Sequence, residues 1–126
     1  MQIQNPDKKW ELELWVNENG SCPVAEFFDE LSRRKNVECE RVKKLLNRFQ
    51  THSLLHLRQS QDIGRVINEE FWEIRFSVGI EVRLLGVIRE ENNKSKFIAV
   101  HGFHKKDQKI RKSDIDKACD RIQQIT

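Results

Sequence analysis

A change to two-residue periodicity partway along the chain constrains its fold more than any other feature. Every second residue is apolar in 72–76 and in 80–84, the residues between them are charged, the period continues to Ile88, and Gly79 marks a turn between the two segments. A third segment, 96–103, follows a second turn and is apolar on both sides, which is typical of a central strand. Because short turns join the three segments, the pattern predicts an antiparallel meander.

The first half of the chain predicts one more strand and two helices. Residues 10–16 alternate with period two, so we expect a half-buried strand. Pro23 suits the first turn of a helix, and Asn36 is the expected cap of a second helix. The basic residues of that second helix are expected to face solvent: Arg41, Lys43, Lys44 and Arg48. Residues 51–68 mix leucines with many polar residues, which indicates a loop with a short helix.

A last helix is predicted from Ser113, with Asp116 in place of the usual capping-box glutamate. The chain has 126 residues, the length of about one domain, so we expect residues 1–126 to form a single domain. The expected fold class is α+β. It comprises a small antiparallel sheet of about four strands, packed with two N-terminal helices and a C-terminal helix.

Motifs and composition exclude several function classes. No run approaches the ~20 apolar residues of a membrane span, and no signal-peptide pattern is present, so a cytoplasmic protein without a membrane partner is expected. The three cysteines are an odd number, at spacings that fit neither a disulfide framework nor a zinc site. Gly-rich nucleotide loops, nucleophile elbows and metal-ligand clusters are also missing from the sequence. We therefore expect no metal and no small-molecule cofactor.

The net charge of +3 is unevenly distributed along the chain. Residues 1–40 carry a net charge of −4, whereas residues 41–126 carry +7. The stretch 104–113 alone holds five basic residues and one acid. This asymmetry favours a basic surface for a polyanion or an acidic partner.

Two arginines are candidates for phosphate binding. By strand parity Arg75 and Arg83 project from the same face of neighbouring strands, away from the aromatic side. A guanidinium group can bind two phosphate oxygens at once, so this face suits a phosphate. The alternative is that the arginines form cross-strand ion pairs, Arg75 with Glu73 or Glu81, and Arg83 with Glu81.

The histidines differ in their expected roles. By strand parity His101 shares a face with Phe97, Ala99 and Phe103. We expect it to be hydrogen-bonded and partly buried. His104 lies on the opposite side beside two lysines, and cationic neighbours favour the neutral imidazole that a general base requires. His52 and His56 are expected at the surface.

Four stretches of the chain carry motifs that recur together in one group of proteins. They are Ser21–Phe27 (S-P-V-x-E-F-L), Phe71–Arg75 (W-E-L-R), the arginine-bearing Val82–Leu85, and Ala99–Lys106 (H-G-F-x-K-K). Cys22 is a departure from the first of these motifs. In this order they resemble the RelE/HigB superfamily of bacterial toxins, especially its phage-derived HigB-like branch. The likeness covers about residues 10–125.

The resemblance implies a toxin of a type II toxin–antitoxin pair that acts as a ribosome-dependent mRNA endoribonuclease. In that family the substrate's own 2′-hydroxyl attacks the adjacent phosphate without a metal, while basic side chains stabilise the transition state. The implied partners are a cognate antitoxin, the ribosome and mRNA. Two alternatives remain on the same scaffold: a ParE-like inhibitor of DNA gyrase without nuclease activity, and an inactive phage-derived binding module.

Positional matching to the family supplies most of the expected site. The catalytic candidates are Arg75, Arg83, His104, Lys105 and Lys106. Of these, His104 enters through its position in this chain, as a proton-transfer group, and the others match family residues. The residues expected to bind RNA are Lys109, Arg111 and Lys112. This chain lacks the C-terminal tyrosine of several relatives, and Ile110–Arg111 stands where a proline is usual.

Overall fold

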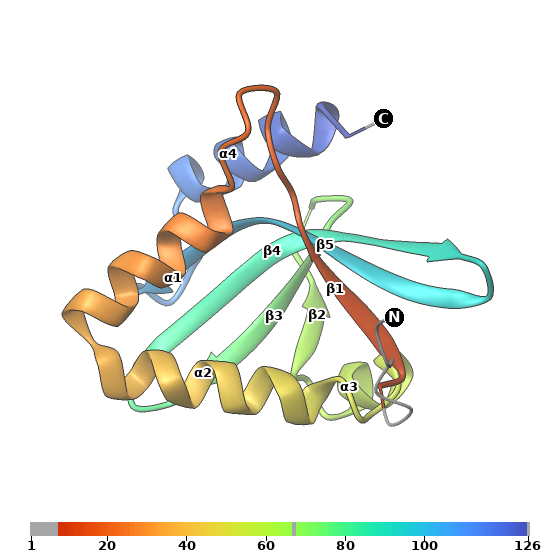
Figure 1. The fold of residues 1–126 in the computed structure, drawn as a ribbon, viewed down its shortest axis with the longest axis horizontal. Helices are drawn as coiled ribbons and strands as arrows, with labels where there is room; N and C mark the ends of the chain where they lie inside the picture. The colour runs from red at the N-terminus through yellow and green to blue at the C-terminus, as the bar shows by residue number, and fades with distance from the viewer. Residues whose placement is uncertain (1–7, 67, 126) are drawn as a thin grey trace.

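The computed structural model describes residues 8–66 and 68–125, which form four helices and one five-stranded sheet (Figure 1). In chain order the elements are β1 (Trp10–Leu14), α1 (Pro23–Arg34), α2 (Asn36–Phe49), α3 (Leu54–Gln59), β2 (Ile63–Arg65), β3 (Trp72–Ser77), β4 (Glu81–Glu91), β5 (Lys94–Lys105) and α4 (Lys112–Gln123). The predicted α+β class is confirmed. The sheet has one strand more than expected, because β2 has only three residues and is too short to show alternation in the sequence.

The strands lie in the order β1-β5-β4-β3-β2. The predicted meander of β3, β4 and β5 is confirmed, and β2 pairs antiparallel with β3. The sheet is nevertheless mixed, since β1 runs parallel to β5, from Trp10 opposite Ser95 to Leu14 opposite Ala99. No hairpin turn links these two strands, so their direction is not restricted to antiparallel.

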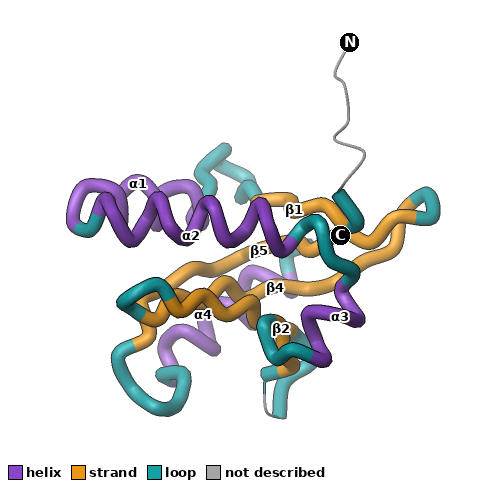
Figure 2. Tube along the Cα trace, turned by 90° about the horizontal axis from the view of Figure 1, so that it is seen from below, coloured by secondary structure: helices purple, strands orange, loops and turns teal. Residues whose placement is uncertain are grey.

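Helices cover both faces of the sheet. Figure 2 shows α1 and α2 on one side of the strands and α4 on the other. The face toward α1 and α2 carries one apolar cluster, which includes Trp10, Ile74 and Phe76. The face toward α4 carries a second cluster around Leu85 and Val100. The apolar sides predicted for β3 and β4 are confirmed by the first cluster, and apolar residues of the helices complete both clusters.

A β-bulge in β5 changes which residues share a face. Leu85 lies opposite His101, but the next residue, Gly86, lies opposite Ala99, so Val100 is the extra residue. Ala99 therefore packs toward α1 and α2, whereas Val100 packs toward α4. The prediction that His101 shares a face with Phe97 and Ala99 is wrong for this reason. Phe103 does share its face, since the two rings stack at 5.5 Å.

Two predicted helix caps are wrong. Lys35 is the N-cap of α2 and Asn36 its first residue, because the Lys35 amide closes α1 while its carbonyl accepts from Cys39 in α2. Helix α4 begins at Lys112 rather than Ser113, and its cap residue makes no side-chain cap hydrogen bond within the described chain. None of the helices that the structure describes is both long and apolar enough to cross a lipid bilayer.

Candidate functional site

The five predicted catalytic residues lie in two pockets rather than one. Arg75 and Arg83 line a cleft of about 430 Å³ at the outer edge of β3, which we call the β3 pocket. His104, Lys105 and Lys106 line a cleft of about 380 Å³ at the C-terminal end of β5, which we call the β5 pocket. No residue lines both pockets among those that the structure describes.

Strand register explains this separation. Arg75 lies directly opposite Arg83, so the two share a face, as predicted. His104 lies opposite Val82, which packs in the cluster beneath α1 and α2. Because directly opposed residues point to the same side of a sheet, His104 and Arg83 project from opposite faces. Lys105 lies opposite Glu81 and returns to the face of the arginines.

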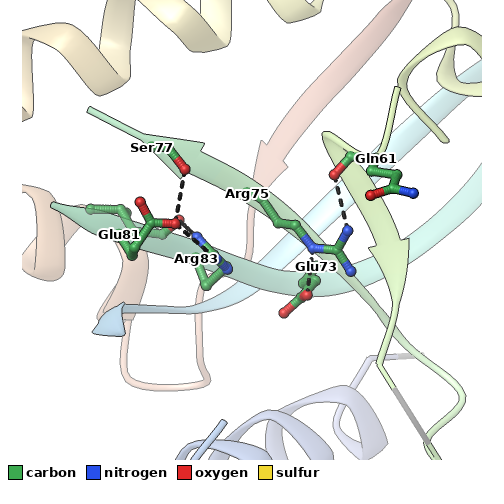
Figure 3. A network of polar contacts seen from close by, with 7 residues as sticks. Gln61, Glu73, Arg75, Ser77, Glu81 and Arg83 are labelled. Carbon is green, nitrogen blue, oxygen red and sulfur yellow. Dashed lines mark hydrogen bonds and ion pairs between the residues drawn. The ribbon is translucent and has the colours of Figure 1, made fainter. Parts of the chain in front are cut away.

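Both arginines in the β3 pocket are held by carboxylates, as Figure 3 shows. The Nε atom of Arg75 donates to Glu73 at 2.7 Å, and a terminal nitrogen of Arg83 donates to Glu81 at 3.1 Å. Ser77 also donates to that Glu81 oxygen, at 2.8 Å. The ion-pair alternative is thus right about the partners. Each ion pair, however, lies within a single strand, β3 for Arg75 and β4 for Arg83, because residues two apart in a strand share a face.

The β5 pocket forms where β5 extends past β1. Pairing between these two strands ends at Ala99, and beyond it none of the described strands pairs with β5 on that side. Helix α1 packs there instead. A Cβ at Gly102 would lie 2.6 Å from Cδ2 of Phe27, so the missing side chain lets Phe27 rest directly on the strand. This packing brings the end of α1 beside His104.

Cationic side chains dominate the β5 pocket. Three segments of the chain contribute lysines or arginines to its lining. These seven residues are Arg34, Lys35, Lys105, Lys106, Lys109, Arg111 and Lys117. The pocket also contains three acids, and each has a partner: Glu30 pairs with Arg34 at 3.5 Å, Asp107 with Arg111 at 2.6 Å, and Asp114 with His101 at 2.7 Å. The five lysines form no ion pair within residues 8–66 and 68–125, so their charge is available to an anion.

His104 is the titratable group at the centre of this charge. Burial lowers the pKa of its imidazole, and the nearby charges of Lys106, Lys35 and Arg34 lower it further. The predicted direction is confirmed, although burial has the larger effect. A pKa below the ordinary 6.5 leaves the ring neutral at pH 7, so it can accept a proton.

His101 has a different environment and a structural role. Its Nε2 lies 2.7 Å from an Asp114 carboxylate oxygen, and its Nδ1 lies 3.0 Å from a terminal nitrogen of Arg121. Because arginine can only donate, Nδ1 accepts and the proton sits on Nε2. Burial lowers the pKa of His101, although hydrogen bonding to Asp114 acts in the opposite direction. The expected buried, hydrogen-bonded histidine is confirmed, and it links β5 to α4.

The other predicted residues divide between the pockets and the surface. Lys109 and Arg111 line the β5 pocket, whereas Lys112 is exposed at the start of α4 and lines neither pocket. Sequence reasoning missed three cations of the β5 pocket: Arg34, Lys35 and Lys117. The basic run at the end of α1 could have indicated the first two. Arg48, His52 and His56 are exposed, as predicted, but they also line the β3 pocket.

A family model described as "Phage derived protein Gp49-like (DUF891)" matches residues 26–123. The chain belongs to the Gp49-like family. The matched span contains every residue that lines the β3 and β5 pockets of this Gp49-like chain. Gp49-like proteins are a toxin-like family associated with toxin–antitoxin systems. No curated protein and no solved structure matches the chain.

Proposed function

We propose that this Gp49-like chain is the toxin of a type II toxin–antitoxin pair and that it cleaves mRNA in the ribosome at the β5 pocket. Membership of a toxin-like family supports the first part. One observation supports the second: His104 has a lowered pKa in a pocket lined by seven cationic side chains. A proton acceptor among phosphate-binding groups is what attack by a 2′-hydroxyl on phosphorus requires.

The reaction follows from these groups. The neutral imidazole of His104 takes the proton of the 2′-hydroxyl as O2′ forms a bond to phosphorus. The bond from phosphorus to O5′ then breaks, and the ammonium group of Lys106 protonates the departing oxygen and later regains its proton from water. Lys105 and the end of α1 stabilise the extra negative charge on the phosphoryl oxygens. The products are a 2′,3′-cyclic phosphate and a 5′-hydroxyl.

Recognition of the message falls to the rest of the basic surface. Arg75 and Arg83 bind RNA backbone away from the reacting bond, while Lys109, Arg111 and Lys112 hold it beside the β5 pocket. The cognate antitoxin covers this pocket with an acidic segment, because a pocket rich in unpaired lysines attracts carboxylates as well as phosphates. Toxin, antitoxin and ribosome then meet in the cytoplasm.

Primer extension on translated mRNA tests the proposal. Purified chain is added to ribosomes programmed with a defined message, and the ends of the fragments are mapped. We expect cuts that leave 2′,3′-cyclic phosphate, and no cut where the reacting nucleotide is 2′-deoxy. The double variant Lys105→Gln/Lys106→Gln should cut about 100-fold more slowly or worse. The matched control is Lys43→Gln/Lys44→Gln, which removes the same charge from the exposed side of α2.

Two results would contradict the proposal. One is an intact message at every chain concentration that arrests growth. The other is a double variant that cuts as fast as its control. If messages stay intact and the chain instead blocks supercoiling by DNA gyrase, the scaffold acts as a gyrase inhibitor.

A further inference from the structure

The β3 pocket has cationic and aromatic groups that the proposed reaction does not use. It lies against the end of β3 and is lined from α2, α3 and the segments beside them. Its positively charged lining residues are Arg48, Arg75 and Arg83. Two imidazole rings, those of His52 and His56, also line it. Asp62 is the one acid in this lining, and it accepts a hydrogen bond from Ser60 at 2.6 Å.

The arginines of this pocket retain unused donors. Arg83 is only 6% exposed, yet its buried Nε has no hydrogen-bond partner among the described residues. Its two terminal nitrogens donate to the Val82 carbonyl and to Glu81. Arg75 donates to Glu73 and to the Gln61 carbonyl, and its second terminal nitrogen lies over Gly64, where a side chain would collide with it. The Nε atom of Arg83 has almost no exposed surface, so an incoming acceptor would have to bind the terminal nitrogens, each of which carries a second N–H group beyond the hydrogen bond given above.

His52 and His56 both line the β3 pocket, and their rings stack on each other. Their ring centroids are 4.6 Å apart and the ring planes differ by 21°, so the imidazoles are stacked. Both residues are exposed. An exposed stacked ring offers its face to a nucleobase, and single-stranded RNA is commonly bound through such stacking.

The β3 pocket is close enough to the β5 pocket for one RNA strand to reach both. Arg83 lines the first pocket and Phe103 the second, and the two residues lie directly opposite on β4 and β5. Neighbouring strands lie about 4.7–4.9 Å apart. Because β4 lies between β3 and β5, the two pockets at the outer edges of these strands are separated by about two strand spacings.

We propose that the β3 pocket is a second RNA subsite, in which the arginines bind a phosphate away from the cleaved bond and the paired imidazoles stack on a base beside that phosphate. The subsite rests on the proposed function in one respect, that RNA is the substrate. It adds a base-contacting element, His52 and His56, on the opposite edge of the sheet from the reacting groups. Base preference of the cleavage is then set partly in the β3 pocket.

Binding of an uncleavable RNA tests the subsite separately from cleavage. The probe is a short 2′-O-methyl RNA oligonucleotide with a fluorophore, and its affinity is measured by anisotropy over a salt series. We expect His52→Ala/His56→Ala to weaken binding about tenfold, the loss of one base-stacking contact. Arg48→Gln should weaken binding and reduce the slope of log affinity against log salt by about one. The matched control is Arg33→Gln, an exposed arginine of α1 that lines neither pocket.

A second measurement uses the intact chain and no variant. The imidazole C–H signals of His52 and His56 should shift in NMR spectra when the oligonucleotide is added. The proposal is overturned if these signals do not move, or if the double histidine variant and Arg48→Gln bind as tightly as Arg33→Gln. If the wild-type chain does not cleave mRNA but its affinity for the oligonucleotide depends on His52 and His56, only the proposed function is wrong. If the chain cleaves mRNA but its affinity for the oligonucleotide does not depend on these histidines, only the subsite is wrong.

Discussion

Replacing His101 by leucine should loosen the connection between β5 and α4. The residue is 7% exposed, and its ring bridges Asp114 at 2.7 Å and Arg121 at 3.0 Å. Arg121 also donates to the Val100 carbonyl at 3.0 Å, so the bridge fixes the helix to the bulge. Leucine fills a similar volume but makes neither hydrogen bond. It leaves a mostly buried carboxylate and a guanidinium group without their partner.

The size of the effect follows from these contacts. A hydrogen bond to a charged group contributes about 1.5–3 kcal/mol, and two are lost in His101→Leu. Asp114 and Arg121 are partly exposed and regain some solvation, so we expect the free energy of unfolding to fall by about 3 kcal/mol. At about 4 °C per kcal/mol for a chain of this size, Tm falls by about 12 °C.

Stability should also depend on pH through this residue. Burial lowers the pKa of His101 in the folded chain below its ordinary 6.5, so the unfolded chain binds the proton first as the pH falls. The contribution of neutral His101 to the free energy of unfolding is complete above pH 6.5. It is lost as the pH falls through the lower pKa that His101 has in the folded chain. His104 has a lowered pKa of the same sign, so His104→Gln is the control that keeps the His101 contribution.

Urea unfolding between pH 5 and 8 measures both effects in wild type, His101→Leu, Asp114→Asn and the double variant. We expect the two substitutions to be coupled by about 1–2 kcal/mol, and the pH dependence of stability to weaken in His101→Leu but not in Asp114→Asn. Strict additivity within about 0.5 kcal/mol, together with an unchanged pH slope in His101→Leu, would refute the bridge as the link to α4.

Two further predictions concern the β5 pocket. The variant Arg34→Gln/Lys35→Gln removes the cations at the end of α1, which should raise the pKa of His104. The acid limb of the pH–rate profile for RNA cleavage should therefore move to higher pH. A profile unchanged from wild type would contradict this. Gly102→Ala should push Phe27 off the strand, lower the free energy of unfolding by about 1–3 kcal/mol and slow cleavage. Thermal unfolding and single-turnover kinetics measure these two effects. Full activity with an unchanged Tm would show that this packing does not position the pocket.

The faces of β3 and β4 could be predicted from alternation alone, because both strands keep their period of two from end to end. The same reasoning failed in β5 at His101. The bulge adds one residue at Val100 and reverses the phase. It lies where Gly86 packs so closely on β5 that a side chain there would overlap the Ile98 carbonyl. The sequence shows the glycine but does not show what it contacts.

Part of the candidate site could also be predicted from the sequence. The basic loop after β5 is visible as a charge run, and the lowered pKa of His104 follows in direction from its lysine neighbours. The basic run that contains Arg34 and Lys35 is visible too, but its position beside His104 is not, because that position depends on Phe27 packing on Gly102, 75 residues away. Parity also could not show that His104 and Arg83 project from opposite faces, since the bulge lies before His104 on the same strand.

The rate at which His104→Gln cleaves ribosome-bound mRNA shows whether His104 is the general base of the reaction. Single-turnover cleavage is measured for the variant and wild type at pH 7, with the affinity of each for the ribosome measured in parallel. We expect a rate about 10²–10⁴-fold lower in the variant, with unchanged affinity for the ribosome, because a general base is lost while the cations remain. A variant that cuts at the wild-type rate would contradict the claim that His104 accepts the 2′-hydroxyl proton.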